Sequence, residues 1–211
     1  MNNRASFLVS FWSVLISRLQ EEGHQVTCLV PVGDSEAEAT LKGFGASIRN
    51  YPLDNKGLNP VHDLKTCLAL YRIFREERAD ILYASTIKSV IYGIPMAALA
   101  GIRSRYAMIT GLGYMFEANT SKKMLTYLAS SLYRISLSFS DAVFFQNTDD
   151  VQTFRDWHCL PRGAHVVMTK GGSGHGQVCR GTSSRSPLTF LLVEGFLKPR
   201  DCMNMRKRHV W

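Results

Sequence analysis

Segments with helical periodicity alternate with short apolar segments along most of this 211-residue chain, and this alternation restricts the possible folds more than any other feature. Apolar residues recur every three or four positions in the predicted helices, and turn residues bound the short apolar runs that mark strands. Strands and helices that alternate at this spacing form right-handed βαβ units, so the sequence predicts an α/β fold with a doubly wound parallel sheet. The predicted helices are residues 5–22, 35–44, 64–74, 90–100, 122–139 and 149–157, and the predicted strands are residues 25–31, 46–53, 80–85, 103–110, 141–146 and 164–169.

Three of the predicted helices have informative apolar patterns. The helix at residues 90–100 is apolar nearly all round, which is typical of a helix that is buried or faces a membrane. The helix at residues 64–74 and the helix at residues 122–139 each have an apolar stripe, and we expect the first stripe to be its buried face. The stripes consist of Leu64, Cys67, Leu68, Tyr71 and Phe74, and of Leu125, Leu128, Leu132, Ile135 and Phe139.

The positive charge of the chain is concentrated near its end. The net charge is +8, but residues 162–211 contain nine basic and two acidic residues and so carry +7, while residues 1–161 carry +1. Because the main part of the chain is nearly neutral, we predict no nucleic-acid partner. The longest apolar runs are too short to span a bilayer and the first residues do not form a secretory signal, so we expect a cytoplasmic protein.

The cysteine and histidine residues do not form a recognisable metal or disulfide pattern. The five cysteines include no C-x-x-C pair, which argues against both a zinc ribbon and a disulfide framework, and we predict reduced thiols and no metal. Alternating glycines at residues 172–176 are not followed by a helical pattern, so they do not match a dinucleotide-binding fingerprint. No Gly-x-Ser-x-Gly turn is present between a strand and a helix, which argues against a serine hydrolase.

Three predicted strands end in residues that could bind a ligand. They are followed by residues 85–88 (Ser-Thr-Ile-Lys), 110–114 (Thr-Gly-Leu-Gly-Tyr) and 146–147 (Gln-Asn). In a parallel sheet these segments fall at one edge, where ligands of open α/β sheets collect, and glycines there allow a sharp turn and close backbone approach. The set of groups suits a polyhydroxylated or phosphorylated ligand. Alternatively, the hydroxyl and amide residues only cap the following helices.

Several short motifs in this order resemble the N-terminal domain of glycosyltransferase family 4-like enzymes that build bacterial capsule, O-antigen and exopolysaccharide. The resemblance covers residues 3–174. It is carried by residues 23–26 (Gly-His-Gln-Val), 57–60 (Gly-Leu-Asn-Pro) with 63–64, 86–88 with 91–93, 109–114 with Phe116, 132–134, 145–147 with 149–150, and 172–174.

This resemblance implies a Rossmann-like domain that forms the N-terminal, acceptor-side half of a GT-B glycosyltransferase. Such an enzyme transfers a sugar from a UDP- or GDP-sugar to a lipid-linked acceptor without a cofactor, and it contacts the inner face of the membrane peripherally. The resemblance identifies no catalytic residue, because the donor-gripping glutamates of the family belong to the second domain. It implies that the substrate-binding residues are Thr86, Lys88, Gly111, Gly113, Tyr114, Gln146, Asn147 and Ser173.

The chain departs from the family pattern at both ends. No strand precedes Asn3, where the family has its first and central strand, and residues 175–211 form an aberrant basic tail in which residues 190–193 resemble the first strand of a second domain. We therefore expect a truncated or frameshifted glycosyltransferase that is inactive on its own. The competing hypothesis is a non-enzymatic module that binds or associates with membranes through residues 90–100 and the basic tail.

Overall fold

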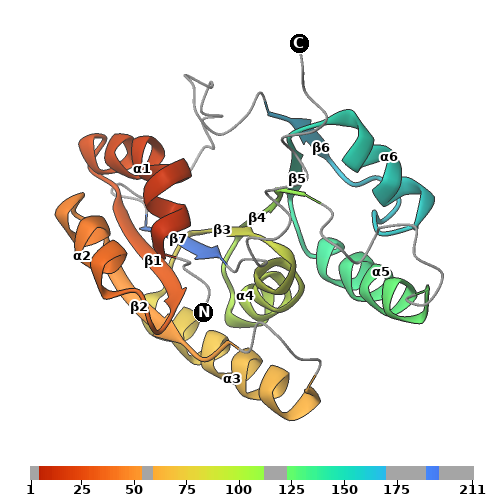
Figure 1. Cartoon of the computed structure of the whole chain (residues 1–211), viewed down its shortest axis with the longest axis horizontal. Helices are drawn as coiled ribbons and strands as arrows, with labels where there is room; N and C mark the ends of the chain where they lie inside the picture. Colours follow the sequence, from red (N-terminus) through yellow and green to blue (C-terminus); the bar gives the residue numbers. More distant parts are fainter. Residues whose placement is uncertain (1–4, 54–58, 112–122, 170–188, 195–211) are drawn as a thin grey trace.

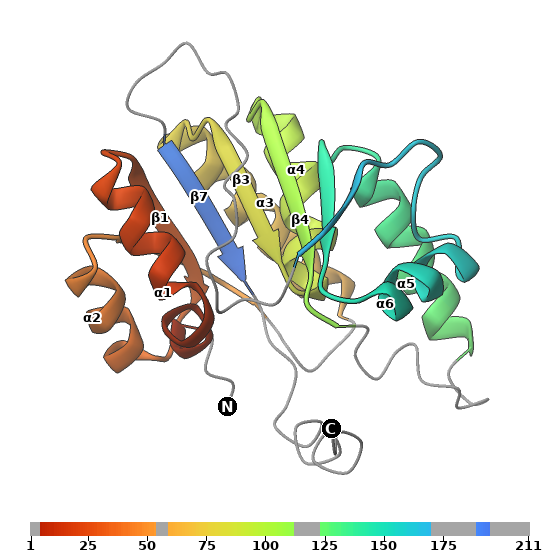
Figure 2. The same cartoon turned by 90° about the horizontal axis from the view of Figure 1, so that it is seen from above.

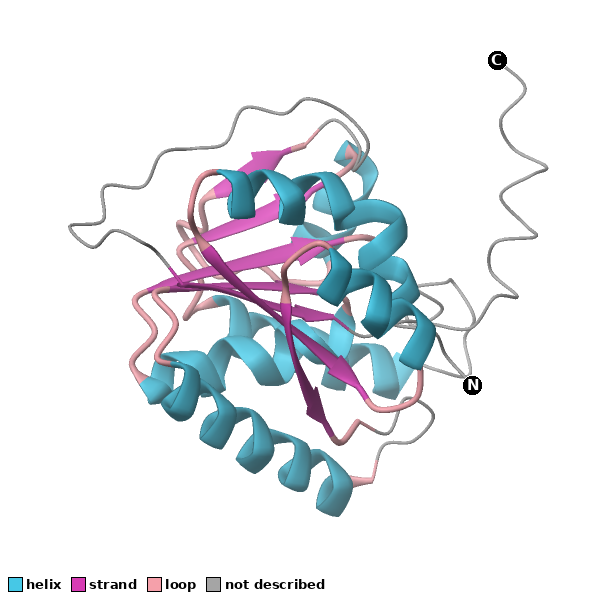
Figure 3. Ribbon diagram, turned by 90° about the vertical axis from the view of Figure 1, so that its left-hand side faces the viewer, coloured by secondary structure: helices cyan, strands magenta, loops and turns pink. Residues whose placement is uncertain are grey.

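The protein forms an open parallel sheet between two layers of helices (Figure 3). The description rests on a computed structural model and covers residues 5–53, 59–111, 123–169 and 189–194. The helices are α1 (Ala5–Glu21), α2 (Ser35–Gly43), α3 (Pro60–Glu77), η1 (Ser89–Gly93), α4 (Ile94–Ala100), α5 (Lys123–Leu137) and α6 (Thr148–Asp156). The strands are β1 (Gln25–Pro31), β2 (Ser47–Tyr51), β3 (Ile81–Ser85), β4 (Ser104–Ile109), β5 (Ala142–Phe145), β6 (Val166–Met168) and β7 (Thr189–Glu194). The predicted doubly wound α/β fold is confirmed.

The sheet has the strand order β2-β1-β7-β3-β4-β5-β6, and every neighbouring pair is parallel. The chain runs outward in one direction through β1 and β2, then crosses over through α3 and runs in the other direction through β3, β4, β5 and β6. This reversal creates a topological switch point in the middle of the sheet. Ligands of open α/β sheets bind outside the carboxyl ends of the strands at such a point.

Strand β7 occupies the central position between β1 and β3, although it follows them by about a hundred residues or more in the sequence (Figures 1 and 2). Leu191 is in register with Thr27 on one side and with Leu82 on the other. The resemblance predicted that the central strand is missing and that this segment comes from a second domain. The structure instead places Thr189–Glu194 in the central position; the origin of the segment stays a prediction.

Helices α1 and α2 cover one face of the sheet. Leu8, Trp12 and Ile16 of α1 are buried against Val26 and Cys28 of β1 in one apolar cluster. Asp34 fixes both helices, because one carboxylate oxygen accepts a hydrogen bond from the amide of Ala37 at the start of α2 and the other accepts from the amide of Ser6 in α1. The same carboxylate thus caps one helix and joins it to its neighbour.

Helices α3, α4, α5 and α6 pack on the second apolar cluster. Its largest members include Leu70 and Phe74 of α3, Tyr133 of α5 and Phe154 of α6, all at most 1% exposed. Tyr133 and Phe154 meet edge to face with ring centroids 4.9 Å apart. Burial of side chains of this size contributes about 1.5–3 kcal/mol each, so this cluster stabilises the packing of these helices on strands β3 to β5.

The prediction of the buried face of α3 is wrong, because most residues of the predicted stripe are exposed. Thr66, Leu70 and Phe74 are buried, whereas Leu64, Leu68 and Tyr71 are 60%, 49% and 36% exposed. In the stripe of the helix predicted at residues 122–139, Leu128, Ile135 and Phe139 are likewise exposed. Each helix has a second set of residues at helical spacing, rich in small hydroxyl and aromatic side chains, and that set faces the sheet.

The predicted helix at residues 90–100 is confirmed as a buried helical segment, but it is divided. Its first turn is the π-helix η1, and the α-helix begins at Ile94. Pro95 lacks the amide hydrogen for an ordinary helical hydrogen bond to the carbonyl of Ile91, which favours a change of helix type at this point.

Candidate functional site

Polar residues follow β3, β4 and β5 at the edge where these parallel strands end. Ser85 at the end of β3 is in register with Met108 of β4, and Ile109 is in register with Phe145 at the end of β5. The arrowheads of β7 and β3 point to this same edge in Figure 2. The predicted site residues that lie at the edge are Thr86, Lys88, Gly111, Gln146 and Asn147, whereas Gly113, Tyr114 and Ser173 lie outside the described residues.

The backbone at the end of β3 has an uncommon conformation. Thr86 has a φ of +74°, which is unfavourable for a β-branched residue, and the π-helix η1 begins three residues later. The hydroxyl of Ser85 is completely buried and has no hydrogen-bond partner within the described part of the chain. Backbone strain, π-helical turns and unsatisfied buried polar groups each occur preferentially at functional sites. Their coincidence singles out this strand end.

Lys88 is held in place by Asp63, which lies 25 positions earlier in the sequence. Its Nζ donates a hydrogen bond of 3.0 Å to Oδ1 of Asp63 in the first turn of α3, and it lies 5.9 Å from the ring centroid of Tyr92. The side chains of Lys88 and Asp63 are 18% and 17% exposed. Burial, together with a hydrogen bond to Asp63, raises the pKa of Tyr92 well above its usual value. The ammonium group of Lys88 has three N–H donors, so the ion pair with Asp63 does not by itself prevent Lys88 from contacting a ligand.

Asn147 acts as a helix cap. Its Oδ1 accepts a hydrogen bond of 2.7 Å from the amide of Asp150, and its Nδ2 donates one of 3.0 Å to the Asp150 carboxylate. Burial raises the pKa of Asp150, while the hydrogen bond from Asn147 opposes this effect. Of the two roles that the sequence left open for Asn147, the structure supplies evidence for capping.

Gly111 ends β4 with a φ of +145°, a conformation that side chains strongly disfavour. A Cβ atom at this position would meet no other atom within 4 Å. The glycine is therefore required by the turn of the backbone rather than by crowding from the protein itself.

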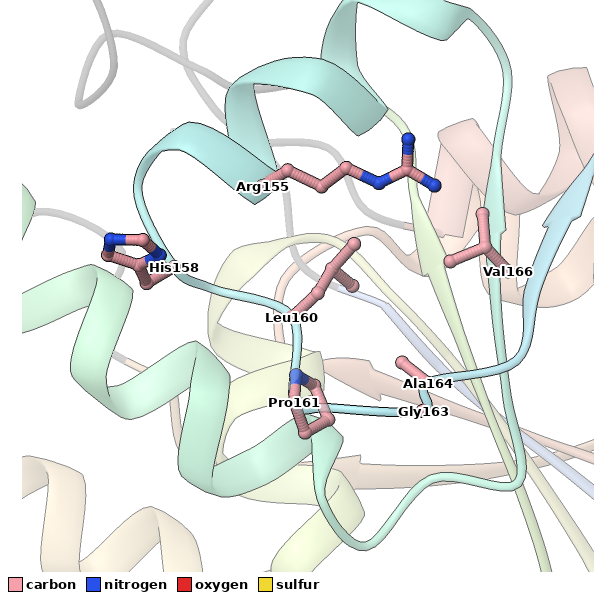
Figure 4. Close-up of a pocket in the computed structure, with 7 residues that line it drawn as sticks. All are labelled: Arg155, His158, Leu160, Pro161, Gly163, Ala164 and Val166. Atoms are coloured by element: carbon pink, nitrogen blue, oxygen red, sulfur yellow. The ribbon is translucent and has the colours of Figure 1, made fainter.

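Two shallow pockets lie in the described structure, and neither contains the predicted site residues. The pocket in Figure 4 has a volume of about 270 Å³ and lies at the amino end of β6, away from the candidate edge. It is lined by Arg155, His158, Leu160, Pro161, Gly163, Ala164 and Val166. The second, of about 360 Å³, lies where β2 ends and α3 begins, and so belongs to the candidate edge. It is lined by Pro52, Leu53, His62, Lys65 and Thr66.

The surface expected for the competing membrane module is mostly interior. Val90, Ile91, Ile94 and Ala97 are at most 8% exposed, and only Leu99 among the large apolar residues of this segment is strongly exposed. Residues 90–100 are therefore core, because they fill the space between β3 and the helices α3 and α5. No helix in the described ranges is long and apolar enough to cross a membrane. In the same ranges, no cluster of three or more His, Cys, Asp or Glu side chains is placed to hold a metal ion.

Sequence reasoning missed the roles of Asp63 and Tyr92. Asp63 and Tyr92 occur within motifs of the resemblance. Tyr92 lies four positions after Lys88, a spacing at which helical residues are neighbours, but nothing in the sequence shows that Asp63 meets Lys88. A lysine that comes shortly after a predicted buried strand is expected to be partly buried, and a buried ammonium group needs an acidic partner. This expectation could have prompted a search for the partner of Lys88.

A doubly wound parallel sheet with polar residues at its carboxyl edge defines a Rossmann-like domain of the ligand-binding class. The sequence model of the glycosyl transferase 4-like family matches residues 1–147, and the chain belongs to this family. The resemblance drawn from the motifs is thereby confirmed, and the fold is that of the N-terminal half of a GT-B glycosyltransferase.

The chain is also similar to a curated enzyme from Campylobacter jejuni, an N,N'-diacetylbacillosaminyl-diphospho-undecaprenol alpha-1,3-N-acetylgalactosaminyltransferase. The two are 24% identical over 172 residues, which cover 81% of this chain and 45% of that enzyme. The chain thus spans less than half the length of this relative.

Proposed function

We propose that this chain is the acceptor-side domain of a glycosyltransferase that moves a sugar from a UDP- or GDP-sugar to a lipid-linked, diphosphate-bearing acceptor. The family match over residues 1–147 carries this proposal, and the name of the Campylobacter relative supports an acceptor of this class. The reaction needs no metal ion in this proposal. Because a polyprenyl acceptor resides in a bilayer, the protein works peripherally at the inner face of the cytoplasmic membrane.

In this proposal the carboxyl edge of the sheet binds the polar end of the acceptor. The ammonium group of Lys88 lies near the diphosphate, because a cation at this edge of the sheet attracts phosphate oxygens. Thr86, Gly111 and Gln146 lie along the neighbouring sugar, and Asn147 contributes through the start of α6. The family resemblance also assigns Gly113, Tyr114 and Ser173 to substrate binding. Donor binding in this proposal falls to a second domain, as in the GT-B architecture that the family resemblance implies.

Isothermal titration with a short-chain prenyl diphosphate N-acetylhexosamine in detergent tests the proposal. A double variant, D63N/K88M, removes both charges and so leaves no unpaired charge in the core. We expect it to bind at least about tenfold more weakly, the usual effect of one charge-assisted hydrogen bond. The control K42M removes one exposed lysine from the last turn of α2 and should bind like the parent.

Two results would contradict the proposal. The first is a parent chain that does not bind the acceptor analogue at millimolar concentration while its thermal unfolding shows a folded protein. The second is equal affinity of D63N/K88M and K42M. Transfer of radiolabelled sugar by the chain alone would refute the narrower statement that it needs a donor-binding domain.

A further inference from the structure

Helix α3 exposes a continuous apolar stripe. Val61, Leu64, Leu68 and Tyr71 are 60%, 60%, 49% and 36% exposed, and their spacing of three and four residues places them on one side of the helix. The opposite side holds the helix on the sheet through the buried residues Thr66, Leu70 and Phe74. The outward face is therefore presented by a firmly packed element.

Basic side chains accompany the stripe. Lys65, Arg72 and Arg75 are exposed and fall within the same half of the helix surface, and none of them forms an ion pair with the described part of the chain. We call the set of Val61, Leu64, Lys65, Leu68, Tyr71, Arg72 and Arg75 the α3 face.

The acidic groups of α3 are offset by cations from other elements. Asp63 pairs with Lys88, and Glu76 and Glu77 at the last turn both pair with Arg49 of β2 at 2.7 and 2.6 Å. The α3 face thus combines apolar side chains with three cations, while Glu76 and Glu77 share the single cation of Arg49 and leave one negative charge at the last turn. Basic and apolar side chains on one helix face are the combination that favours binding to a membrane containing anionic lipid.

The position of α3 relates this face to the candidate site. The helix begins where β2 ends, at the carboxyl edge of the sheet, and Asp63 in its first turn holds Lys88. A bilayer in contact with α3 would therefore lie beside the residues proposed to bind the acceptor.

We propose that the α3 face is the surface by which this protein rests on an anionic bilayer. This inference rests on the proposed function for its biological meaning, but its physical basis is independent of any sugar chemistry. Helix α5 also exposes apolar residues, namely Met124, Tyr127, Leu128 and Ile135, at 87%, 63%, 51% and 59%. Among the described side chains of α5, Arg134 is the exposed basic residue, compared with Lys65, Arg72 and Arg75 on α3.

Vesicle flotation of the full chain tests the inference, with vesicles of phosphatidylcholine containing about 30% phosphatidylglycerol, an anionic lipid, and no acceptor lipid. The variant R72Q/R75Q should bind about 30-fold more weakly, because each basic residue near such a surface contributes about a factor of five. The variant L64S/L68S should bind on the order of tenfold more weakly, through loss of apolar contact. Both pairs are exposed, and circular dichroism should show an unchanged fold.

Matched controls remove the same chemistry elsewhere. R155Q/R162Q removes two exposed arginines from the region of the amino end of β6, and L128S/I135S removes two exposed apolar residues from α5. All variants keep the basic segment after residue 169. We expect both controls to bind like the parent, and binding of the parent to disappear on vesicles of pure phosphatidylcholine.

The inference is overturned if the parent does not bind the anionic vesicles, if the α3 variants bind like the parent, or if the controls lose as much binding as the α3 variants. Equal binding of all proteins would assign the interaction to the basic segment after residue 169. Because acceptor binding is measured separately in detergent, each of these results leaves the test of the proposed function intact.

Discussion

The pair of Asp63 and Lys88 gives a quantitative prediction. Its atoms are 3.0 Å apart and both side chains are less than one-fifth exposed, so the pair lies closer to the buried limit than to the surface limit. Loss of one partner of a buried pair costs about 3–5 kcal/mol, whereas an exposed pair contributes about 0.2–1 kcal/mol. We therefore expect D63N and K88M each to lower the free energy of unfolding by about 2 kcal/mol, between these limits. Both substitutions keep the side-chain volume, and methionine keeps the aliphatic stem of the lysine.

A double-mutant cycle by urea unfolding measures the interaction between the two side chains. The double variant should be less destabilised than the sum of the single variants by about 1.5 kcal/mol, because it leaves no unpaired charge. The coupling should persist in about 0.5 M salt, since a partly buried pair is only weakly screened. A coupling below about 0.3 kcal/mol, the scatter expected of independent sites, would refute the reasoning.

The same perturbation has a spectroscopic readout at Tyr92. Burial first, and then the Asp63 carboxylate, raise the pKa of its phenol, so D63N should lower that pKa. In the parent, a phenol whose folded-state pKa lies above its unfolded value of about 10 favours folding fully below about pH 10, and this stability is lost as the pH rises further. NMR titration of the Tyr92 ring in parent and D63N should show the difference, and an unchanged pKa would place Asp63 away from the phenol.

Further predictions concern the cap, the strained residue and the central strand. N147A should lose about 1 kcal/mol in urea unfolding while N147S keeps most of the stability, and equal losses would argue against a capping role. T86G should be about 1 kcal/mol more stable than T86A, because both variants lose the hydrogen bond from the Thr86 hydroxyl to Ser89 and only glycine adopts a positive φ without strain; equal stability of the two variants would show that this position is not strained. Leu192 is in register with Cys28, so L192C should form a disulfide with Cys28 on mild oxidation, which peptide mapping would detect. The control L191C is one residue out of register and should not form this disulfide. A disulfide from L191C alone would contradict the placement of β7.

Much of the fold follows from local pattern. The short apolar runs identified β1 and β5 within one or two residues, because buried parallel strands need an apolar side chain at almost every position. The apolar character of residues 90–100 correctly indicated burial. Periodicity did not reveal which of two stripes on α3 faces the sheet, since both repeat at helical spacing and only the fit against the strands selects Thr66 and Leu70 over Leu64 and Leu68.

Long-range pairing is the part that local pattern could not supply. The run at Thr189–Glu194 reads as a strand in any context, but its partners are β1 and β3, far away in the sequence. The ion pair of Lys88 with Asp63 spans 25 positions and depends on the crossover of α3. The φ of Thr86 is likewise imposed by the surrounding structure, because the residue itself disfavours it.

Chemical-shift mapping of acceptor binding tests the central claim most directly. Titration of the labelled chain with the prenyl diphosphate N-acetylhexosamine should shift the backbone amides of Thr86, Lys88, Gly111 and Gln146 together, at the carboxyl edge of the sheet. Shifts that gather instead around the pocket at Arg155 would contradict the claim, as would an unchanged spectrum of a folded protein at saturating ligand.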